Sequence, residues 1–502
     1  MSLVVETKYG RVRGMKQGNV YVWKGIPYAK APVGPLRFKP PQPPEPWRGI
    51  REATQFGPAA PQPLHMLPSL VSDEIGVSED CLTLNIWSSD LRGPLKPVLV
   101  WIHGGAYVSG TSALSLYDGA SFAEKGNLVF VSFNYRLGPL GYVWLGEYGE
   151  EYRASGNCGT LDQIAALRWI RDNIAAFGGD PEQVTVFGQS SGAGSVSVLL
   201  SIDEVRTLFQ RAILQSWSTA STIDCQSAER VTRQFLKILG IQKNPIANLL
   251  NMPAEKLADA VVKMPFVSFR PVIDGLILDQ PPLEAVGKGV ADGKSLIVGS
   301  TRDEYWLKAT KERAFQTGDG SLMVEYVREK TMPYWPEIAS YYLNNQEAGR
   351  SLAERMKRLM TFHMYTYSVE QLITRLVQRP VRLWTYRFDW RSPVLQGALG
   401  ACHGMELPFV FHTFDSPLGQ ARTGFASDRA VLSGIMHGAW SAFASTGNPN
   451  GPMVPTWPNC KNPDRACMIF DRHCQVKQDP HRKEREIWDQ AVCKAGIIHS
   501  PI

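Results

Sequence analysis

Residues 188–192 (Gly-Gln-Ser-Ser-Gly) limit what this chain can fold into more than any other segment. They follow an apolar, β-branched run at 184–187 and precede a stretch of small and apolar residues at 193–200 that suits a helix. A G-x-S-x-G turn between a strand and a helix holds its serine exposed on a strained backbone, and the flanking glycines avoid clashes with the adjoining strand and helix. This context favours a nucleophilic Ser190 over the alternative of a plain Gly/Ser helix start.

Short apolar runs alternate with helical patterns along the chain. Residues 98–102 and 128–133 are typical of strands buried on both faces. Apolar residues recur near the helical period over 162–177, and the pattern stops at two glycines. Further apolar runs lie at 184–187, 211–214, 295–298 and 381–388. The alternation predicts an α/β fold with a large, mostly parallel central sheet flanked by helices.

Two regions, about 225–283 and 305–378, break this rhythm. The second is rich in Arg, Lys, Tyr and Met at helical spacing. We expect both to be helical insertions over the C-terminal edge of the sheet, where a substrate pocket would form.

A nucleophilic hydroxyl needs N–H donors for the oxyanion that its attack creates. Residues 103–107 (His-Gly-Gly-Ala-Tyr) form a glycine-rich turn directly after the 98–102 run. We predict that the backbone N–H groups of Gly105, Ala106 and Ser191 make a three-donor oxyanion hole. A plain turn that ends a strand is the alternative, and the elbow at Ser190 weighs against it.

The chain resembles the type-B carboxylesterases, a family that includes bacterial para-nitrobenzyl-type esterases and, more distantly, cholinesterases. The resemblance covers nearly the whole chain and implies the α/β-hydrolase fold in a single domain, 1–502. It also implies two structural ion pairs, Arg37 with Glu79 and Arg136 with Asp162. Beyond the elbow and the glycine-rich turn, its motifs lie at residues 9–14, 25–29, 35–38, 78–85, 134–138, 161–163 and 177–181.

The same resemblance places the other two members of a catalytic triad. The family's acid lies in a G-x-x-[RK]-D-E pattern, which implies Glu304 at the end of residues 299–304. Its general base lies in an H-G-x-E-x-x-F-V-F pattern, which implies His403 at the start of residues 403–411. The resulting order of serine, acid and histidine is the order that this fold requires. The implied activity is hydrolysis of carboxylic esters through an acyl-enzyme on Ser190, without a metal or an organic cofactor.

Departures from the family pattern concern the substrate. Gln189 stands where the family usually has Glu, and Trp217 and Tyr305 stand where it prefers Gly. The loop 61–77 lacks the tryptophan that binds quaternary ammonium groups in cholinesterases. We therefore do not expect choline esters as substrates. We expect a preference for short acyl chains, because Trp217 and Tyr305 would narrow the pocket. The candidate pocket residues are Tyr107, Gln189, Trp217, Phe409 and Phe411.

Composition excludes several other classes. The net charge is only +6 over 502 residues, and lysines and arginines are scattered, which argues against nucleic-acid binding. The sequence contains no run of about 20 apolar residues, so we expect no membrane span. Eight sparse cysteines favour free thiols, mostly buried, and the N-terminus has no signal-peptide pattern, so we expect a cytoplasmic protein. The resemblance to para-nitrobenzyl-type esterases implies a bacterial one. The expected partner is a small-molecule ester, and the chain is expected to be a monomer or a small homo-oligomer.

Two alternatives to a carboxylesterase stay open from the sequence. A lipase acting on long-chain esters would need a long apolar lid, and the segment 61–77 is apolar but short. A non-catalytic binding module of the same fold would have lost the serine or the histidine, whereas this chain keeps every chemical position. Amide or carbamate cleavage would use the same machinery.

Overall fold

The computed structural model describes residues 3–63, 75–265, 268–344 and 350–496. The candidate lipase lid falls largely on residues 64–74, which lie outside the described residues. The chain divides into two compact units. The first comprises Met1–Ile213, Ser221–Val290 and Trp440–Asn448, and the second Leu214–Ala220, Ala291–Ala439 and Pro449–Ile502. The single domain expected from the sequence stays a prediction.

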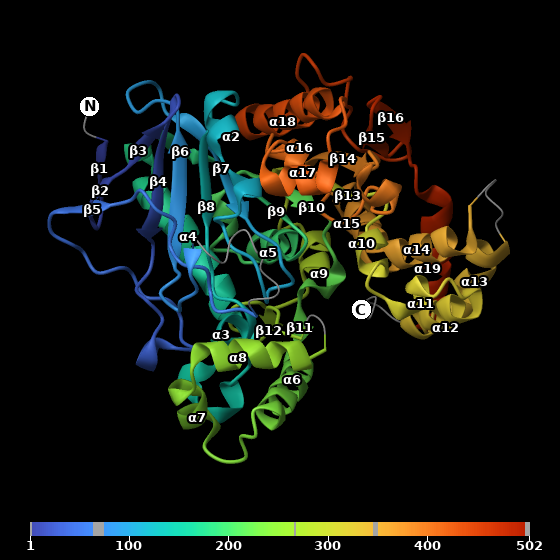
Figure 1. Ribbon diagram of the computed structural model, residues 1–502, viewed down its shortest axis with the longest axis horizontal. Helices are drawn as coiled ribbons and strands as arrows, with labels where there is room; N and C mark the ends of the chain where they lie inside the picture. The colour runs from blue at the N-terminus through green and yellow to red at the C-terminus, as the bar shows by residue number, and fades with distance from the viewer. Residues whose placement is uncertain (1–2, 64–74, 266–267, 345–349, 497–502) are drawn as a thin grey trace. The chain divides into compact units, whose positions relative to one another are not determined.

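The first unit is built on a mixed sheet of the α/β-hydrolase type (Figure 1). The strands β8, β7 and β9 are parallel to one another, whereas β6, β4 and β3 continue the sheet in antiparallel fashion. The two runs read as buried strands are confirmed, because every residue of β8 is buried and β7 is almost as fully covered. The sheet strands are β3 (Met15–Gln17), β4 (Val20–Pro27), β6 (Thr83–Ser88), β7 (Lys96–Ile102), β8 (Val129–Phe133) and β9 (Gly179–Gln189). A strand beyond β9, β10 (Arg211–Gln215), carries the chain across the boundary at Ile213.

Helices and two small sheets complete the first unit. Residues 225–283 contain the helices α6, α7 and α8, which lie together in Figure 1. The helices are α2 (Ala120–Glu124), α3 (Gly138–Tyr142), α4 (Cys158–Asn173), α5 (Ser191–Leu200), α6 (Cys225–Ile238), α7 (Pro245–Asn251), α8 (Ala254–Ala260) and α9 (Pro282–Gly287). The small sheets are formed by β1 (Val4–Thr7), β2 (Gly10–Arg13) and β5 (Ile50–Glu52), and by β11 (Ile223–Asp224) with β12 (Val272–Ile273).

Both predicted ion pairs are present in the first unit. Arg136 holds Asp162 through two N–H groups at 2.7 and 2.8 Å, and both side chains are buried. Arg37 holds Glu79 at 2.5 and 2.8 Å and also donates to backbone carbonyls at the end of α7, including that of Met252 at 2.7 Å. Because each guanidinium is also bonded to backbone carbonyls, the pairs fix loops as well as neutralise buried charge.

The second unit has its own strands, β13 (Ser295–Thr301), β14 (Arg382–Phe388), β15 (Ala466–Phe470) and β16 (Gln475–Gln478). The first three are parallel, and β16 is antiparallel to β15. Its helices are α10 (Trp306–Ala309), α11 (Arg313–Gln316), α12 (Gly320–Thr331), α13 (Trp335–Asn344), α14 (Leu352–Thr361), α15 (Tyr367–Leu376), α16 (Leu407–Val410), α17 (Pro417–Thr423) and α19 (Arg482–Ala495). A π-helical turn, Phe362–Thr366, joins α14 to α15. Helix α18 (Arg429–Thr446) carries the chain back to the first unit.

Helices of the second unit enclose a separate apolar core. Trp488 of α19 lies at its centre, in ring contact with Tyr334, Phe362 and Tyr367. Tyr305 belongs to this core, is 1% exposed, and has its hydroxyl 2.9 Å from that of Tyr326. The expectation that Tyr305 narrows a substrate pocket is therefore wrong, because the turn into α10 directs its ring among the helices.

No described helix is both long and apolar enough to cross a membrane.

Candidate active site

Ser190 occupies a sharp turn in the first unit, between the end of β9 and the start of α5. Its φ of +59° and ψ of −127° are rare for a residue with a side chain and mark a strained backbone. A Cβ added to Gly188 would lie 2.4 Å from the carbonyl carbon of Gly192, and one added to Gly192 would lie 2.1 Å from the carbonyl oxygen of Ile102. The strand-turn-helix prediction is confirmed, and steric exclusion explains both glycines.

The glycine-rich turn lies against this serine. A Cβ on Gly104 would come within 2.6 Å of the Gln189 carbonyl oxygen and 3.2 Å of the Ser190 Cβ. Gly105 has a φ of +124°, and a Cβ there would lie 1.9 Å from the Ser109 carbonyl oxygen, so only glycine fits. Tyr107 donates its N–H to the Ser191 hydroxyl at 3.3 Å, which ties the turn to the first residue of α5.

The three predicted oxyanion donors therefore come from two adjoining segments. Gly105 and Ala106 sit in the left-handed turn, and Ala106 has a φ of +55°. Ser191 is the first residue of α5, so its N–H is one of the four that helix geometry leaves without an intrahelical acceptor. The positive end of the helix dipole adds to the attraction for a negative oxygen at this position.

His103 packs against the glycine-rich turn. Its ring stacks on Tyr135 at 4.5 Å, and its Nδ1 lies 2.9 Å from the carbonyl oxygen of Gly104. The Tyr135 hydroxyl donates to the His103 carbonyl oxygen at 2.8 Å. Burial lowers the pKa of His103 to about 4, so the imidazole is neutral at physiological pH.

Glu304 and His403 meet in the second unit. The Nδ1 of His403 lies 2.5 Å from Oε2 of Glu304. The other carboxylate oxygen, Oε1, accepts hydrogen bonds from the Ser216 hydroxyl at 2.6 Å and the Thr301 N–H at 2.8 Å. The Glu304 side chain is fully buried, whereas that of His403 is 23% exposed. A buried, hydrogen-bonded carboxylate that holds one ring nitrogen orients the imidazole and selects its tautomer.

A second carboxyl group, Glu406, lies behind this pair. It is fully buried, and the Gln215 amide donates to its Oε1 at 3.1 Å. Its Oε2 has no hydrogen-bond partner among the described residues. Burial first, and then the negative charge of Glu304, raise the pKa of Glu406 to about 7. Glu406 thus holds its proton well above the pH at which an exposed glutamate loses it.

The candidate pocket residues are divided between the units. Tyr107 and Gln189 flank the elbow region of the first unit and are almost fully buried. In the second unit, Trp217 is 1% exposed and follows Ser216, the hydroxyl partner of Glu304. Phe409 packs its ring against Phe388 and Trp390 at 5.3 and 4.9 Å, so part of its surface belongs to the core. Phe411 is also fully buried. Their roles as pocket walls stay predictions.

Three residues near the acid and the base were assigned no role from the sequence. Ser216 holds Glu304, Glu406 lies behind it, and the ring of Tyr365 lies 4.6 Å from that of His403. Glu406 belongs to the H-G-x-E motif and Ser216 precedes Trp217, so both lie in segments that the sequence singled out. No sequence pattern indicated their hydrogen-bond partners, Gln215 for Glu406 and Glu304 for Ser216. Tyr365 lies in the π-helical turn, which no sequence pattern marked.

The predicted site residues thus form two groups, an elbow with its glycine-rich turn in the first unit and an acid–base pair in the second. Such parts are the separate components of a serine nucleophile site.

Comparisons with known proteins bear on both groups. The sequence model of the Carboxylesterase family matches residues 1–488. The chain is 37% identical over 494 residues to the para-nitrobenzyl esterase of Bacillus subtilis (strain 168), which covers 96% of this chain and 98% of that protein. It is 34% identical over 502 residues to the phenmedipham hydrolase of Pseudarthrobacter oxydans, with the same coverage of 96% and 98%. Among solved structures, the carboxylesterase EST55 of Geobacillus stearothermophilus superimposes with a TM-score of 0.89 at 41% identity, over 97% of this chain and all of that one.

Proposed function

We propose a mechanism from the premise that this chain belongs to the carboxylesterase family and is a carboxylic-ester hydrolase. In this mechanism Ser190 is the nucleophile, His403 the general base and Glu304 the acid that orients it. The Ser190 Oγ attacks the ester carbonyl carbon while Nε2 of His403 takes the hydroxyl proton. When the tetrahedral intermediate collapses, the imidazolium returns that proton to the departing alcohol. Water then repeats the sequence on the acyl-enzyme and releases the acid.

The hydrogen-bonded state of Glu304 is the observation that carries this proposal. Two donors, Ser216 and Thr301, occupy one carboxylate oxygen, so the other is left to accept from Nδ1 of His403. A proton on Nδ1 leaves the lone pair on Nε2, which is the tautomer that a general base needs. The buried carboxylate also stabilises the imidazolium that forms during attack.

The backbone donors of the first unit are proposed to hold the oxyanion. Gly105 and Ala106 belong to a turn that is fixed against Ser190 and Ser191 by close contact. Preorganised donors of this kind contribute roughly 10²–10³ each in kcat, because they need no reorganisation when charge develops.

We propose a preference for short acyl chains. Trp217 supports it, since a large buried side chain stands one residue from the hydroxyl that holds Glu304. Gln189 is neutral where an acid is usual in the family, so the site attracts cationic alcohol groups less strongly. The named relatives are a para-nitrobenzyl esterase and a phenmedipham hydrolase, so para-nitrobenzyl esters and phenmedipham are reasonable first substrates.

We also propose that the protein is bacterial and cytoplasmic and that it is a monomer or a small homo-oligomer. The para-nitrobenzyl esterase and the phenmedipham hydrolase come from bacteria, and the eight cysteines are free thiols, five of them buried. Free thiols fit a reducing compartment. Cell fractionation and light scattering coupled to size-exclusion chromatography test these two points.

Hydrolysis of para-nitrophenyl esters from acetate to palmitate tests the proposed function. We expect the wild type to favour the short chains and Ser190→Ala to lose activity by several orders of magnitude while keeping its fold. Activity that rises sharply once a long-chain ester exceeds its solubility limit would point to a lipase instead. A Ser190→Ala protein that keeps wild-type activity would overturn the assignment of the nucleophile.

A further inference from the structure

The second unit contains a cavity that is lined largely by arginine side chains. Its volume is about 190 Å³. We name it the arginine pocket after its five lining guanidinium groups, those of Arg302, Arg350, Arg358, Arg387 and Arg391. Three acids, Asp303, Glu354 and Glu484, and the imidazole of His481 also line it. The triad residues are not among its lining residues, so the arginine pocket belongs to no step of the proposed mechanism.

Ion pairs fix the wall of the pocket. Arg358 of α14 holds Glu484 of α19 through Nε and Nη2, both at 2.8 Å. Arg387 at the end of β14 holds Asp389 at 2.6 and 2.7 Å. Burial would raise the pKa of Glu484, but its interactions with His481 and Arg358 outweigh burial and lower that pKa to about 2. The wall is therefore charged at every physiological pH.

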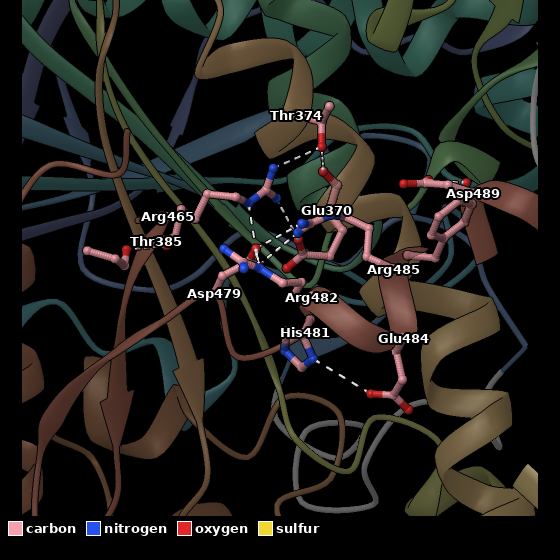
Figure 2. A network of polar contacts seen from close by, with 12 residues as sticks. Glu370, Thr374, Thr385, Arg465, Asp479, His481, Arg482, Glu484, Arg485 and Asp489 are labelled. Atoms are coloured by element: carbon pink, nitrogen blue, oxygen red, sulfur yellow. Dashed lines mark hydrogen bonds and ion pairs between the residues drawn. The ribbon is translucent and has the colours of Figure 1, made fainter. Parts of the chain in front are cut away.

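The polar network in Figure 2 anchors the segment that brings His481 and Glu484 to the pocket. Arg465 binds Glu370 at 2.5 Å, and Arg485 binds both oxygens of Asp479 at 2.7 and 2.8 Å. Asp479 stands two residues before His481, so its bonds to Arg485 of α19 fix the segment that leads into this helix. A site built on such a network is preorganised, since its side chains have little freedom to lose on binding.

Positive charge is in excess around the cavity. Its lining holds five guanidinium groups against three carboxylates. Asp389, which pairs with Arg387, offsets one of these positive charges. Lys357 adds one positive charge, because its ammonium lies 5.3 Å from the ring centre of Trp306, a lining residue. The guanidinium groups of Arg302 and Arg387 also lie close enough to repel each other, as do those of Arg387 and Arg358. An anion between them would relieve this repulsion.

Arg302 and Arg387 each use two N–H groups on a carboxylate and keep donors for a further ligand. A guanidinium has five N–H groups, and a bidentate carboxylate uses two of them. Arg302 holds Asp303 only loosely, at 3.1 and 3.2 Å, which is long for a charge-assisted bond. Arg302 therefore holds its carboxylate less tightly than Arg358 and Arg387 hold theirs, and an incoming anion displaces it more easily.

We propose that the arginine pocket binds a small tetrahedral oxyanion of the phosphate type. Several guanidinium forks that converge from different elements suit a tetrahedral anion better than a planar carboxylate. The volume admits one phosphate with a few waters, since a water takes about 30 Å³. The bound anion joins α14, β14 and the start of α19, so it stabilises the second unit. This proposal does not rest on the ester hydrolase mechanism.

Titration calorimetry with inorganic phosphate tests the proposal on the full chain, in chloride buffers of constant ionic strength. Arg391 is exposed on the rim of the pocket, and Arg391→Glu reverses one charge there. Arg382 is equally exposed, begins the same strand, β14, and does not line the pocket, so Arg382→Glu is the matched control. We expect saturable one-to-one binding that weakens at least tenfold in Arg391→Glu and less than twofold in Arg382→Glu. Phosphate should also raise the melting temperature of the wild type and not that of Arg391→Glu.

Glycerol 3-phosphate separates a free phosphate from a phosphoryl group carried by a larger molecule. If glycerol 3-phosphate binds more tightly than inorganic phosphate, the ligand is a phosphoryl group carried by a larger molecule; if it binds more weakly, the ligand is free phosphate. In either case binding must weaken in Arg391→Glu. The effect of phosphate on hydrolysis of para-nitrophenyl acetate is measured as well, because an anion held at the oxyanion hole would inhibit competitively and one in the arginine pocket would not. If Arg391→Glu is unstable, Arg391→Ala replaces it. The proposal is overturned if neither anion binds saturably, or if Arg391→Glu and Arg382→Glu weaken binding equally.

Discussion

Oε2 of Glu304 lies 2.5 Å from Nδ1 of His403, and the opposite oxygen of the same carboxylate is held by Ser216 and Thr301. The acid therefore cannot rotate without breaking two further hydrogen bonds. This arrangement fixes both the plane of the imidazole and the nitrogen that carries its proton.

Glu304→Gln tests the role of the charge with little change in shape. The amide removes the negative charge that stabilises the imidazolium and favours the wrong tautomer, so kcat should fall by about 10³–10⁴ while KM changes little. Steady-state hydrolysis of para-nitrophenyl acetate measures both constants. Glu284→Gln, an acid in α9 of the first unit, is the control and should keep full activity. A Glu304→Gln enzyme within tenfold of the wild type would contradict the assigned role.

Glu406 should make stability depend on pH. Burial, followed by the charge of Glu304, raises its pKa from 4.5 to about 7 in the folded protein. The stability that this group contributes is therefore fully present below about pH 4.5 and is lost as the pH rises through 7. The loss amounts to at most about 3 kcal/mol.

Glu406→Gln replaces the protonated acid with a neutral group of the same shape. Denaturant unfolding at pH 5, 6, 7 and 8 should show a smaller decline in stability for the variant than for the wild type. Parallel curves for the two proteins would mean that Glu406 titrates normally in the fold.

Gly105→Ala should damage the oxyanion turn. A Cβ at this position would lie 1.9 Å from the Ser109 carbonyl oxygen, so the turn must move. We expect kcat to fall by about 10²–10³, as for loss of one oxyanion donor. Gly18→Ala is the control, because Gly18 also has a positive φ, +59°, but has open space around it. Equal activity of the two variants would remove Gly105 from the site.

Trp217→Gly tests the acyl preference. Removing the indole should raise the rate on octanoate esters relative to acetate esters, because the buried volume becomes available to the acyl chain. Since Trp217 is 1% exposed, the variant should also lose several kcal/mol of stability, and melting curves must show that it is folded. An unchanged ratio of octanoate to acetate hydrolysis in a folded variant would refute a wall role for Trp217.

Local patterns predicted the parts of the fold that depend on local physics. The strand before Ser190, the tight turn and the helix after it are contiguous, and their glycines have steric reasons within that segment. The buried runs at 98–102 and 128–133 were recognisable because a strand covered on both faces is apolar throughout.

Partners distant in the chain were harder to predict. Ser216 lies 88 residues from Glu304 and His403 lies 99 residues from it, and no periodicity connects such positions. Resemblance to a family supplied the pair of Glu304 and His403, but it gave no role to Ser216 or Tyr365. Tyr305 was misjudged because its neighbour in sequence is the acid, whereas the start of α10 directs its ring into the helical core.

Covalent labelling of Ser190 tests the central claim most directly. The wild type is treated with a fluorophosphonate, which forms a stable adduct with an activated serine, and the peptides are then mapped by mass spectrometry. The mechanism predicts one adduct per chain, on Ser190, with loss of esterase activity in proportion to labelling and no labelling of His403→Ala. An adduct on another residue, or full activity in a protein labelled at Ser190, would contradict it.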